Sequence, residues 1–185
     1  MKKNVLTILS LTIMLAFIAP LMTNAQGGKA NFAGTWTLNV EKSTPAPAAP
    51  AGGGGGGGGR GGFGGGPFVC TQDANTLTRT TTRNGQDGTP VTRSTVYTLD
   101  GKENTLATPA GGGGGGGNAV PAKYTATWSA DGKTLTIVTT RTFNDTPTKS
   151  TETWTLTAPK TLSIVSTGMG RDGTPTTRTS VYEIK

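Results

Sequence analysis

Residues 170–185 read GRDGTPTTRTSVYEIK and nearly repeat residues 85–100, which read GQDGTPVTRSTVYTLD. Nine of the sixteen aligned positions are identical. Each copy joins an Asp-Gly pair, which favours the positive φ angles of tight turns, to a proline suited to a strand edge. An alternating run that contains a tyrosine follows in both copies. The repeat therefore predicts hairpins, each made of a strand, a turn and a returning strand.

Period-two alternation continues through most of the chain between its glycine-rich tracts. A weaker copy of the repeat begins at residues 144–147, which read NDTP, and in all three copies an aromatic residue follows the proline by seven positions. Short connections between such strands favour an all-β, antiparallel up-and-down meander of about nine strands. Closure into a barrel removes exposed edges, although a sandwich remains an alternative. The expected strands span residues 32–40, 68–72, 76–84, 91–99, 122–129, 134–143, 148–157, 161–168 and 176–184.

The composition excludes several kinds of site. The chain has 185 residues, no histidine and one cysteine, Cys70. A disulfide framework, a zinc site of cysteine and histidine, and a histidine-based triad are therefore excluded. The lone thiol is expected to be buried as a small apolar side chain, and most acidic residues fall in turns. We expect a protein that is not an enzyme and has no cofactor or metal.

The N-terminus has the pattern of a secretory signal peptide. Two lysines precede a mostly apolar run over residues 5–19, and small or polar residues lead to Ala25. The run is shorter than the ~20 residues that a membrane span needs. We expect cleavage after Ala25, a secreted or periplasmic protein, and no membrane span in the mature chain.

Residues 26–185 are expected to form a single domain interrupted by two low-complexity linkers. Residues 43–66 are rich in proline and then in glycine, and residues 108–121 contain seven consecutive glycines. Such segments form spacers rather than packed elements. Loss of residues 1–25 removes two lysines and lowers the formal net charge from +7 to +5. This modest charge, without a Lys/Arg cluster interleaved with aromatics, does not indicate nucleic-acid binding, and the oligomeric state is left open.

Two short stretches resemble the calycin group of barrel proteins. Residues 32–36 read FAGTW, which resembles the G-x-W signature at the first strand of lipocalins and fatty-acid-binding proteins. Residues 178–185 read RTSVYEIK and look like the closing strand of fatty-acid-binding proteins. The resemblance implies a barrel around a small apolar ligand, whose carboxylate is held by an arginine and a tyrosine near the C-terminus. The matching positions are Gly34, Trp36, Arg178 and Tyr182.

The chain departs from that family in two respects. Three residues separate Arg178 from Tyr182, whereas the fatty-acid-binding pattern has one. The helical lid between the first two strands of that family is replaced by a glycine tract, which cannot form helices. The lipocalin arginine that packs over the first-strand tryptophan implies a second role, Arg178 over Trp36, for the same guanidinium.

Alternation along the strands assigns side chains to the interior when the aromatic residues point inward. One end of the interior is then apolar, with tryptophan, leucine and isoleucine from most strands. The other end, nearer the Asp-Gly-Thr-Pro turns, is polar and contains a single acid. The arginines at that end are Arg83, Arg93, Arg141 and Arg178, and the acid is Glu152. Arg79 and Thr81 also point inward, in phase with Leu77.

Uncompensated guanidinium groups are costly to bury, so these arginines either reach water at an open mouth or meet an anion. Their planar fork suits carboxylate or phosphate. The sequence therefore predicts a binding protein for a small apolar or amphiphilic anionic ligand, with a lipid or acidic amphiphile as partner. The predicted ligand-binding residues are Arg93, Arg141, Glu152, Arg178, Tyr182 and Trp36.

Two alternatives to this prediction follow from the same residues. Arginines beside hairpin turns often extend to solvent while their stems cover apolar surface, and tryptophans usually pack in a core. The chain would then be a structural or surface-interaction module with a solid core and no ligand. An outer-membrane barrel is excluded, because it needs an apolar outward belt and the outward positions here are threonine, lysine and serine.

Overall fold

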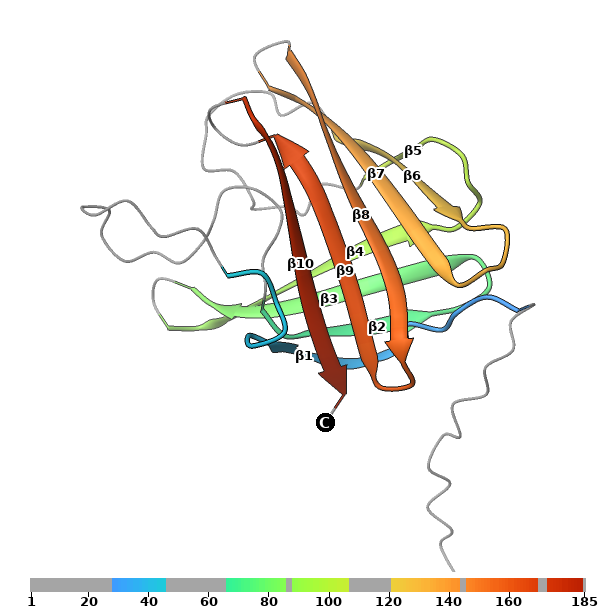
Figure 1. The fold of residues 1–185 in the computed structure, drawn as a ribbon. Helices are drawn as coiled ribbons and strands as arrows, with labels where there is room; N and C mark the ends of the chain where they lie inside the picture. The colour runs from blue at the N-terminus through green and yellow to red at the C-terminus, as the bar shows by residue number, and fades with distance from the viewer. Residues whose placement is uncertain are drawn as a thin grey trace, which may run out of the picture.

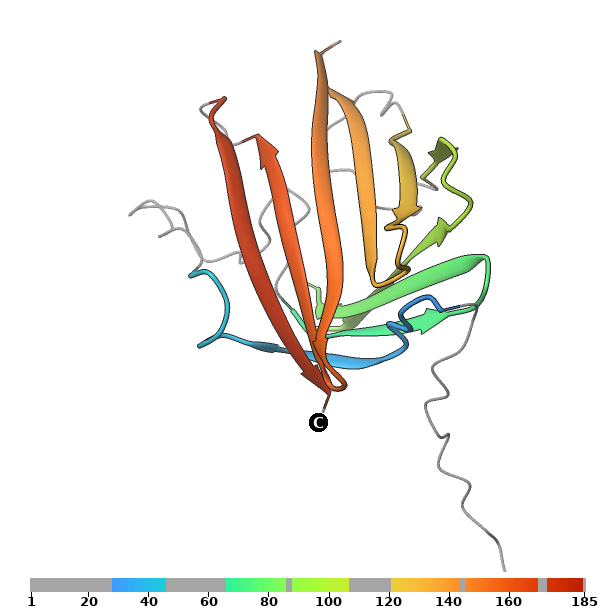
Figure 2. The same cartoon turned by 45° about the vertical axis from the view of Figure 1, so that its right-hand side comes forward.

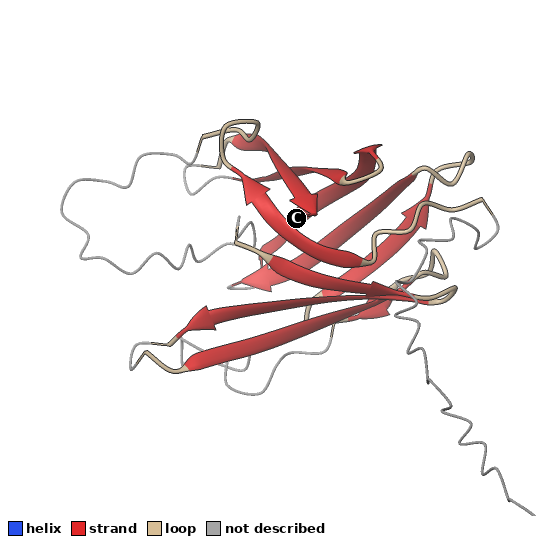
Figure 3. Cartoon of the chain, turned by 90° about the horizontal axis from the view of Figure 1, so that it is seen from below, coloured by secondary structure: helices blue, strands red, loops and turns tan. Residues whose placement is uncertain are grey.

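The computed structural model describes residues 28–45, 66–85, 88–106, 121–143, 146–169 and 173–184, except the side chain of Phe143. All regular structure in these residues is β-strand (Figure 3), and they contain no helix that could cross a membrane. The predicted signal peptide, most of both linkers and the turn residues Asp87, Asp145 and Asp172 lie outside the described residues.

Ten strands follow one another along the described chain. Nine of them match the predicted strands within about two residues at each end. The tenth, β5, has two residues and is too short to leave an alternating pattern. The strands are β1 (Gly34–Asn39), β2 (Phe68–Gln72), β3 (Thr76–Asn84), β4 (Pro90–Thr98), β5 (Asn104–Thr105), β6 (Lys123–Trp128), β7 (Thr134–Phe143), β8 (Thr146–Ala158), β9 (Thr161–Met169) and β10 (Pro175–Ile184).

The strands form one antiparallel sheet in the order β4-β3-β2-β1-β10-β9-β8-β7-β6-β5. The first and last strands therefore meet inside the sheet, where β1 pairs with β10. β1 to β4 run beneath β6 to β10 and at a steep angle to them (Figures 1 and 2), so the sheet curves into a nearly closed barrel. The predicted all-β, up-and-down barrel is confirmed.

Side-chain contacts close the seam between β4 and β6. No ladder joins β4 to β5 in the described residues. Instead, the backbone N–H of Thr98 donates a 2.8 Å hydrogen bond to the Tyr124 hydroxyl. The Tyr97 and Tyr124 rings also meet edge to face with their centroids 5.2 Å apart. The free edge of β4 begins at Pro90, which lacks the N–H that an added strand would need.

The aromatic residues of successive hairpins share the interior. Trp154 pairs with Ile164, and Tyr182 pairs with Leu162. Leu162 and Ile164 are two residues apart on β9 and so lie on one face of the sheet. Trp154 and Tyr182 therefore point to the same side, and both side chains are buried.

The two ends of the barrel differ, and we name them the floor and the mouth. The floor is the end where β2 turns into β3, β6 into β7 and β8 into β9. The mouth is the opposite end, where β3 turns into β4, β7 into β8 and β9 into β10. The floor half contains most of the large apolar side chains, and the mouth half contains most of the inward polar ones.

Residues 28–33 cross the floor as an irregular segment. The Phe32 ring stacks on Trp128 at 5.7 Å between centroids and meets Trp154 edge to face at the same distance. The Phe32 N–H donates to Gln72 Oε1 at 2.9 Å, and its carbonyl accepts from Trp36 Nε1 at 2.8 Å. Phe32 is therefore held by rings and hydrogen bonds at the centre of the floor.

β1 is shorter than the predicted strand at both ends. Gly34 has a φ of 153°, and a Cβ there would come within 2.9 Å of Ile184. The chain bends at this glycine, so Phe32 leaves the strand and enters the floor. Val40 is in phase with Trp36 along the predicted strand 32–40, which would point it inward, but it lies in the turn after β1 and is 74% exposed.

Candidate ligand-binding site

The described arginines and lysines occupy different parts of the barrel. The arginines all lie at inward positions of strands, in the mouth half: Arg79, Arg83, Arg93, Arg141 and Arg178. The lysines lie in turns, in the floor segment or at outward strand positions: Lys29, Lys42, Lys102, Lys123, Lys133, Lys149 and Lys160. Both residue types carry one positive charge, so a requirement for charge alone does not explain why only arginines lie inside. Arginine differs from lysine in its planar fork of five N–H donors, which explains the preference.

Arg79 lies deepest among these arginines and crosses the interior. Its Nη1 lies 3.7 Å from Glu152 Oε1 on the facing strand β8. Its guanidinium lies over the Phe68 ring, 4.5 Å from the centroid. The other oxygen of Glu152 accepts a 3.0 Å hydrogen bond from Trp154 Nε1. The ion pair is therefore fixed to the upper edge of the aromatic floor.

Arg178 lies in register with Glu152. Arg178 is opposite Ser166 on β9, and Ser166 is opposite Glu152 on β8. Two strand spacings place the Cα atoms of Arg178 and Glu152 about 10 Å apart. We call Arg79, Glu152 and Arg178 the inner tier; it contains two guanidinium groups and one carboxylate.

Buried donors without partners are concentrated in the inner tier. The Nε atoms of Arg79 and Arg178 are buried and have no hydrogen-bond partner among the described residues. The third such atom, Trp128 Nε1, lies in the floor. Unpaired buried donors are rare in proteins because each costs about 1–3 kcal/mol. The inner tier can thus accept an oxyanion that supplies the missing acceptors.

The inner tier is mostly shielded from solvent, and the arginines nearer the mouth are exposed. The side chains of Arg79 and Glu152 are 13% and 15% exposed. Arg83, Arg93 and Arg141 are exposed, and we call these three residues the outer tier. These outer arginines extend to solvent, as one alternative from the sequence allowed.

The sequence did not single out Arg79 as a ligand-binding residue. Its position in phase with Leu77 places it inside, but it lies farther along its strand from the hairpin turn than the other inward arginines do. In the structure Arg79 is half-buried over Phe68, whereas Arg93 and Arg141 are exposed. The sequence lacks the information that would have identified Arg79, namely that β8 brings Glu152 opposite it across the interior.

Tyr182 and Trp36 lie below the inner tier. Tyr182 is buried with its ring 4.9 Å from Phe68, and burial raises the pKa of its hydroxyl, an effect that nearby Arg79 partly opposes. Trp36 is 1% exposed in the floor. The structure therefore brings Glu152 and Arg178 together with Arg79, but does not bring Trp36 to them.

The expected stacking of Arg178 over Trp36 is absent. Trp36 pairs with Ile184, which lies six residues along β10 from Arg178. The cation–π contacts within the described residues join Arg79 to Phe68 and Trp154, and Lys29 to Trp128. The length of β10 between its arginine and the floor thus prevents the contact.

Cys70 is buried beside Arg79 in the register of β2 and β3. Burial raises the pKa of its thiol to about 12, and the charge of Arg79 lowers it to a smaller extent. The thiol is therefore protonated at neutral pH. Among the described residues, no group of three cysteine or acidic side chains is placed to hold a metal ion.

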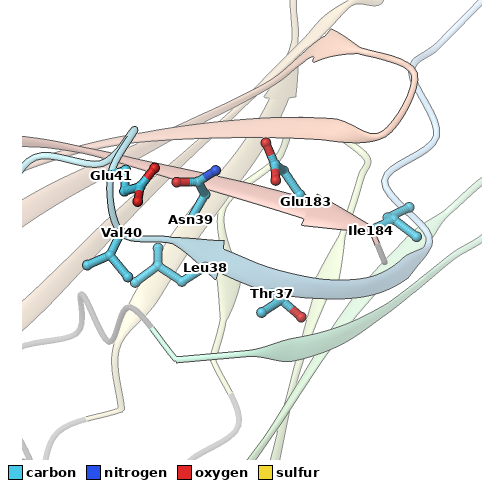
Figure 4. Close-up of a pocket in the computed structure, with 7 residues that line it drawn as sticks. All are labelled: Thr37, Leu38, Asn39, Val40, Glu41, Glu183 and Ile184. Atoms are coloured by element: carbon cyan, nitrogen blue, oxygen red, sulfur yellow. The ribbon is translucent and has the colours of Figure 1, made fainter.

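A hollow of about 350 Å³ runs along β1 and the end of β10, away from the arginines (Figure 4). Its lining residues are Thr37, Leu38, Asn39, Val40, Glu41, Glu183 and Ile184. Of its two carboxylates, Glu183 forms a 2.9 Å ion pair with Lys42 Nζ. The hollow has no buried donor without a partner among its lining residues, unlike the inner tier.

Comparison with known proteins adds no family assignment. No protein-family model matches the chain, and no curated protein matches it.

Proposed function

We propose that the protein is a secreted or periplasmic, lipocalin-like binding protein that holds a small anionic ligand, apolar or amphiphilic in its remainder, at the mouth of its barrel. The acidic group of the ligand binds between Arg79 and Arg178. The outer arginines Arg93 and Arg141 attract it by their charge. The binding is not accompanied by catalysis.

The observation that supports this proposal most is the pair of buried guanidinium nitrogens without partners. Glu152 forms an ion pair with Arg79 and is the one carboxylate of the inner tier, so this tier of two guanidinium groups has an excess positive charge. A positive site beneath exposed arginines also concentrates anions. A carboxylate or phosphate would supply acceptor oxygens and neutralise this excess.

The compartment and the lipocalin likeness are parts of the same proposal. The N-terminal pattern that ends at Ala25 supports export, and an all-antiparallel, nearly closed barrel is compatible with a calycin-like binding protein. Export of the chain is tested separately, by determining the N-terminal residue of the protein isolated from cells.

A ligand screen tests the proposal directly. The purified protein is examined by native mass spectrometry and thermal shift with fatty acids and other acidic amphiphiles, each paired with its neutral methyl ester. We expect some acids to raise the unfolding temperature and their esters to leave it unchanged, because only the acid offers charge and two acceptor oxygens.

Two variants show where the acid binds. Arg178→Met should abolish the shift, since it removes an inner-tier fork while keeping the apolar stem. Arg83→Met is the matched control, because Arg83 is an exposed inward arginine of β3, and it should retain most of the shift. The absence of any acid-dependent shift across the panel, or equal shifts with the esters, would exclude the proposal.

A second function is favoured by a different observation. Phe32, Phe68, Trp128, Trp154 and Tyr182 contact one another in the floor half, and Glu152 partly neutralises Arg79. This packing supports a structural or surface-interaction module with a solid core and no ligand. The two functions differ in the screen: the module gives no shift with any acid.

A further inference from the structure

The inward positions of the mouth half bear hydroxyl groups between the arginines. On β3 and β4, Thr95 is opposite Arg79, and Thr81 is opposite Arg93. On β7 and β8, Thr139 is opposite Ser150, one row mouthward of Glu152. The lining of this half therefore contains guanidinium and hydroxyl groups beside apolar side chains. The apolar ones are Tyr124, Leu38 and Val91, Phe68 at the level of Thr81, and Cys70, Ala126 and Ile137 at the level of the inner tier.

Four of these inward hydroxyls are available for binding, whereas Thr81 donates a 3.5 Å hydrogen bond to the Arg93 carbonyl. The side chains of Thr95, Thr139, Ser150 and Ser166 make no hydrogen bond to another described residue, although Thr139 and Ser166 are 9% and 6% exposed. Several hydroxyls on the outer face, by contrast, bond to one another across strands, as Thr80 does with Ser94 at 2.9 Å and Thr82 with Thr92 at 3.0 Å. No such side-chain pair forms among the inward hydroxyls that the structure describes.

The apolar half offers little to a long tail. The rings of Phe32, Phe68, Trp154 and Tyr182 meet one another at 4.9–5.7 Å between centroids. An alkyl chain that entered the floor would have to displace these contacts. A chain that remained in the mouth half would cover unpaired hydroxyls and leave them without partners, which is costly.

We infer that the ligand is an acid that also carries several hydroxyl groups, of the class of small sugar acids, rather than an acid with an alkyl tail. This inference rests on the anionic binding site of the proposed function, and it replaces the apolar or amphiphilic remainder of the ligand by a hydroxylated one. The carboxylate binds between Arg79 and Arg178, and the ligand hydroxyls bind Thr95, Thr139, Ser150 and Ser166. A site with placed hydrogen-bonding groups selects hydroxylated ligands strongly, because a ligand without them leaves the groups unpaired.

Calorimetric titration of the purified protein with a small panel of probes tests the inference. The probes are glucuronate, galacturonate, their neutral parent sugars and a medium-chain fatty acid, and a galacturonate trimer asks whether the source is a free acid or the end of an acidic polysaccharide. We expect a sugar acid or the trimer to bind at least about tenfold more tightly than the neutral sugar and the fatty acid.

Paired variants identify the hydroxyls. Thr139→Val and Ser166→Ala should each weaken sugar-acid binding by about three- to tenfold and leave binding of the fatty acid unchanged. Thr136→Val is the matched control, since Thr136 lies on the outward face of the same strand β7, and it should change neither. Circular dichroism and thermal unfolding confirm that the variants remain folded.

The outcomes separate the two proposals. Fatty acids that bind through Arg178 while no sugar acid binds would overturn the inference and leave the anionic binding function standing. Absence of binding by every acid would overturn both. Sugar-acid binding that persists in Thr139→Val and Ser166→Ala would also overturn the inference, because the hydroxyls would then have no part in it.

Discussion

The floor half and the mouth half are built from the same strands, yet their inward side chains differ in polarity and in how well their hydrogen-bonding groups are paired. In the floor half, buried aromatic residues contact one another, and Phe32 and Trp36 are joined by a hydrogen bond. In the mouth half, the buried Nε atoms of Arg79 and Arg178 have no hydrogen-bond partner among the described residues. We therefore expect stability to reside mainly in the floor half, and the unpaired donors of the inner tier to serve the proposed binding.

The inner tier marks the boundary between the two halves. Arg79 lies over Phe68, and Glu152 accepts from Trp154 Nε1, so both charged groups rest on the aromatic floor. These contacts thus hold Arg79 and Glu152 in place, while the inner tier keeps an excess positive charge. Substitutions on either side of this boundary should separate stability from binding.

The largest effect is expected from Trp154→Ala in the floor half. The ring contacts Phe32 and Phe68, so its loss should lower the free energy of unfolding by about 3–5 kcal/mol. Denaturant unfolding measures this change. Val96→Ala, at a 52% exposed position, is the control and should change stability by less than about 0.5 kcal/mol. Equal effects of both changes would mean that the floor is not the stabilising half.

Alkaline pH should lower the free energy of unfolding through the titration of Tyr97. Burial, and to a smaller extent Glu152, raise the pKa of Tyr97 to about 12 from 10.0, so the unfolded chain loses this proton first. The contribution of Tyr97 to stability is complete below pH 10 and is lost as pH rises towards 12, by about 1.4 kcal/mol per pH unit. Unfolding curves in this interval measure the slope. Tyr97→Phe should have a shallower slope, and an unchanged slope would contradict the assignment.

Glu152→Gln should separate stability from binding. Removing the carboxylate leaves Arg79 without its counter-charge, so the free energy of unfolding should fall by about 1–3 kcal/mol. The same change should tighten binding of an anionic ligand, because no resident carboxylate competes for Arg79. Glu103→Gln is the control, since its ion pair with Lys123 is about 60% exposed and contributes little. Weaker anion binding in Glu152→Gln would contradict the role given to the inner tier.

The smallest effect concerns the seam of the barrel. Tyr124→Phe removes the acceptor of the Thr98 N–H and should lower stability by about 1 kcal/mol. Hydrogen exchange at the Thr98 amide should become faster, while exchange at amides of β9 remains unchanged. Unchanged exchange at Thr98 would show that the seam is closed by other contacts.

Much of the fold was predictable because the local signals agreed. The repeat at 85–100 and 170–185 identified hairpins, and the spacing from proline to aromatic placed Trp154 and Tyr182 on one face. The alternating pattern predicted Phe32 as part of the first strand, whereas β1 begins at Gly34 and Phe32 lies in the irregular segment before it. The two-residue β5 left no alternating pattern to recognise.

The site was less predictable because it depends on register between strands distant in sequence. Alternation placed Arg79, Glu152 and Arg178 inside, but only the pairing of β8, β9 and β10 aligns Arg178 with Glu152. The distance of each arginine from its hairpin turn does not by itself predict its burial: Arg178 is half-buried, whereas Arg93 and Arg141 are exposed. The same register kept Trp36 away from Arg178, against the expectation from the family resemblance.

The unfolding free energy of Arg178→Met without ligand tests the central claim most directly. If Arg178 serves binding rather than folding, removal of its unpaired buried Nε should leave stability unchanged or raise it by about 1 kcal/mol. A loss of more than about 1 kcal/mol would contradict the account, because the arginine would then be part of the fold.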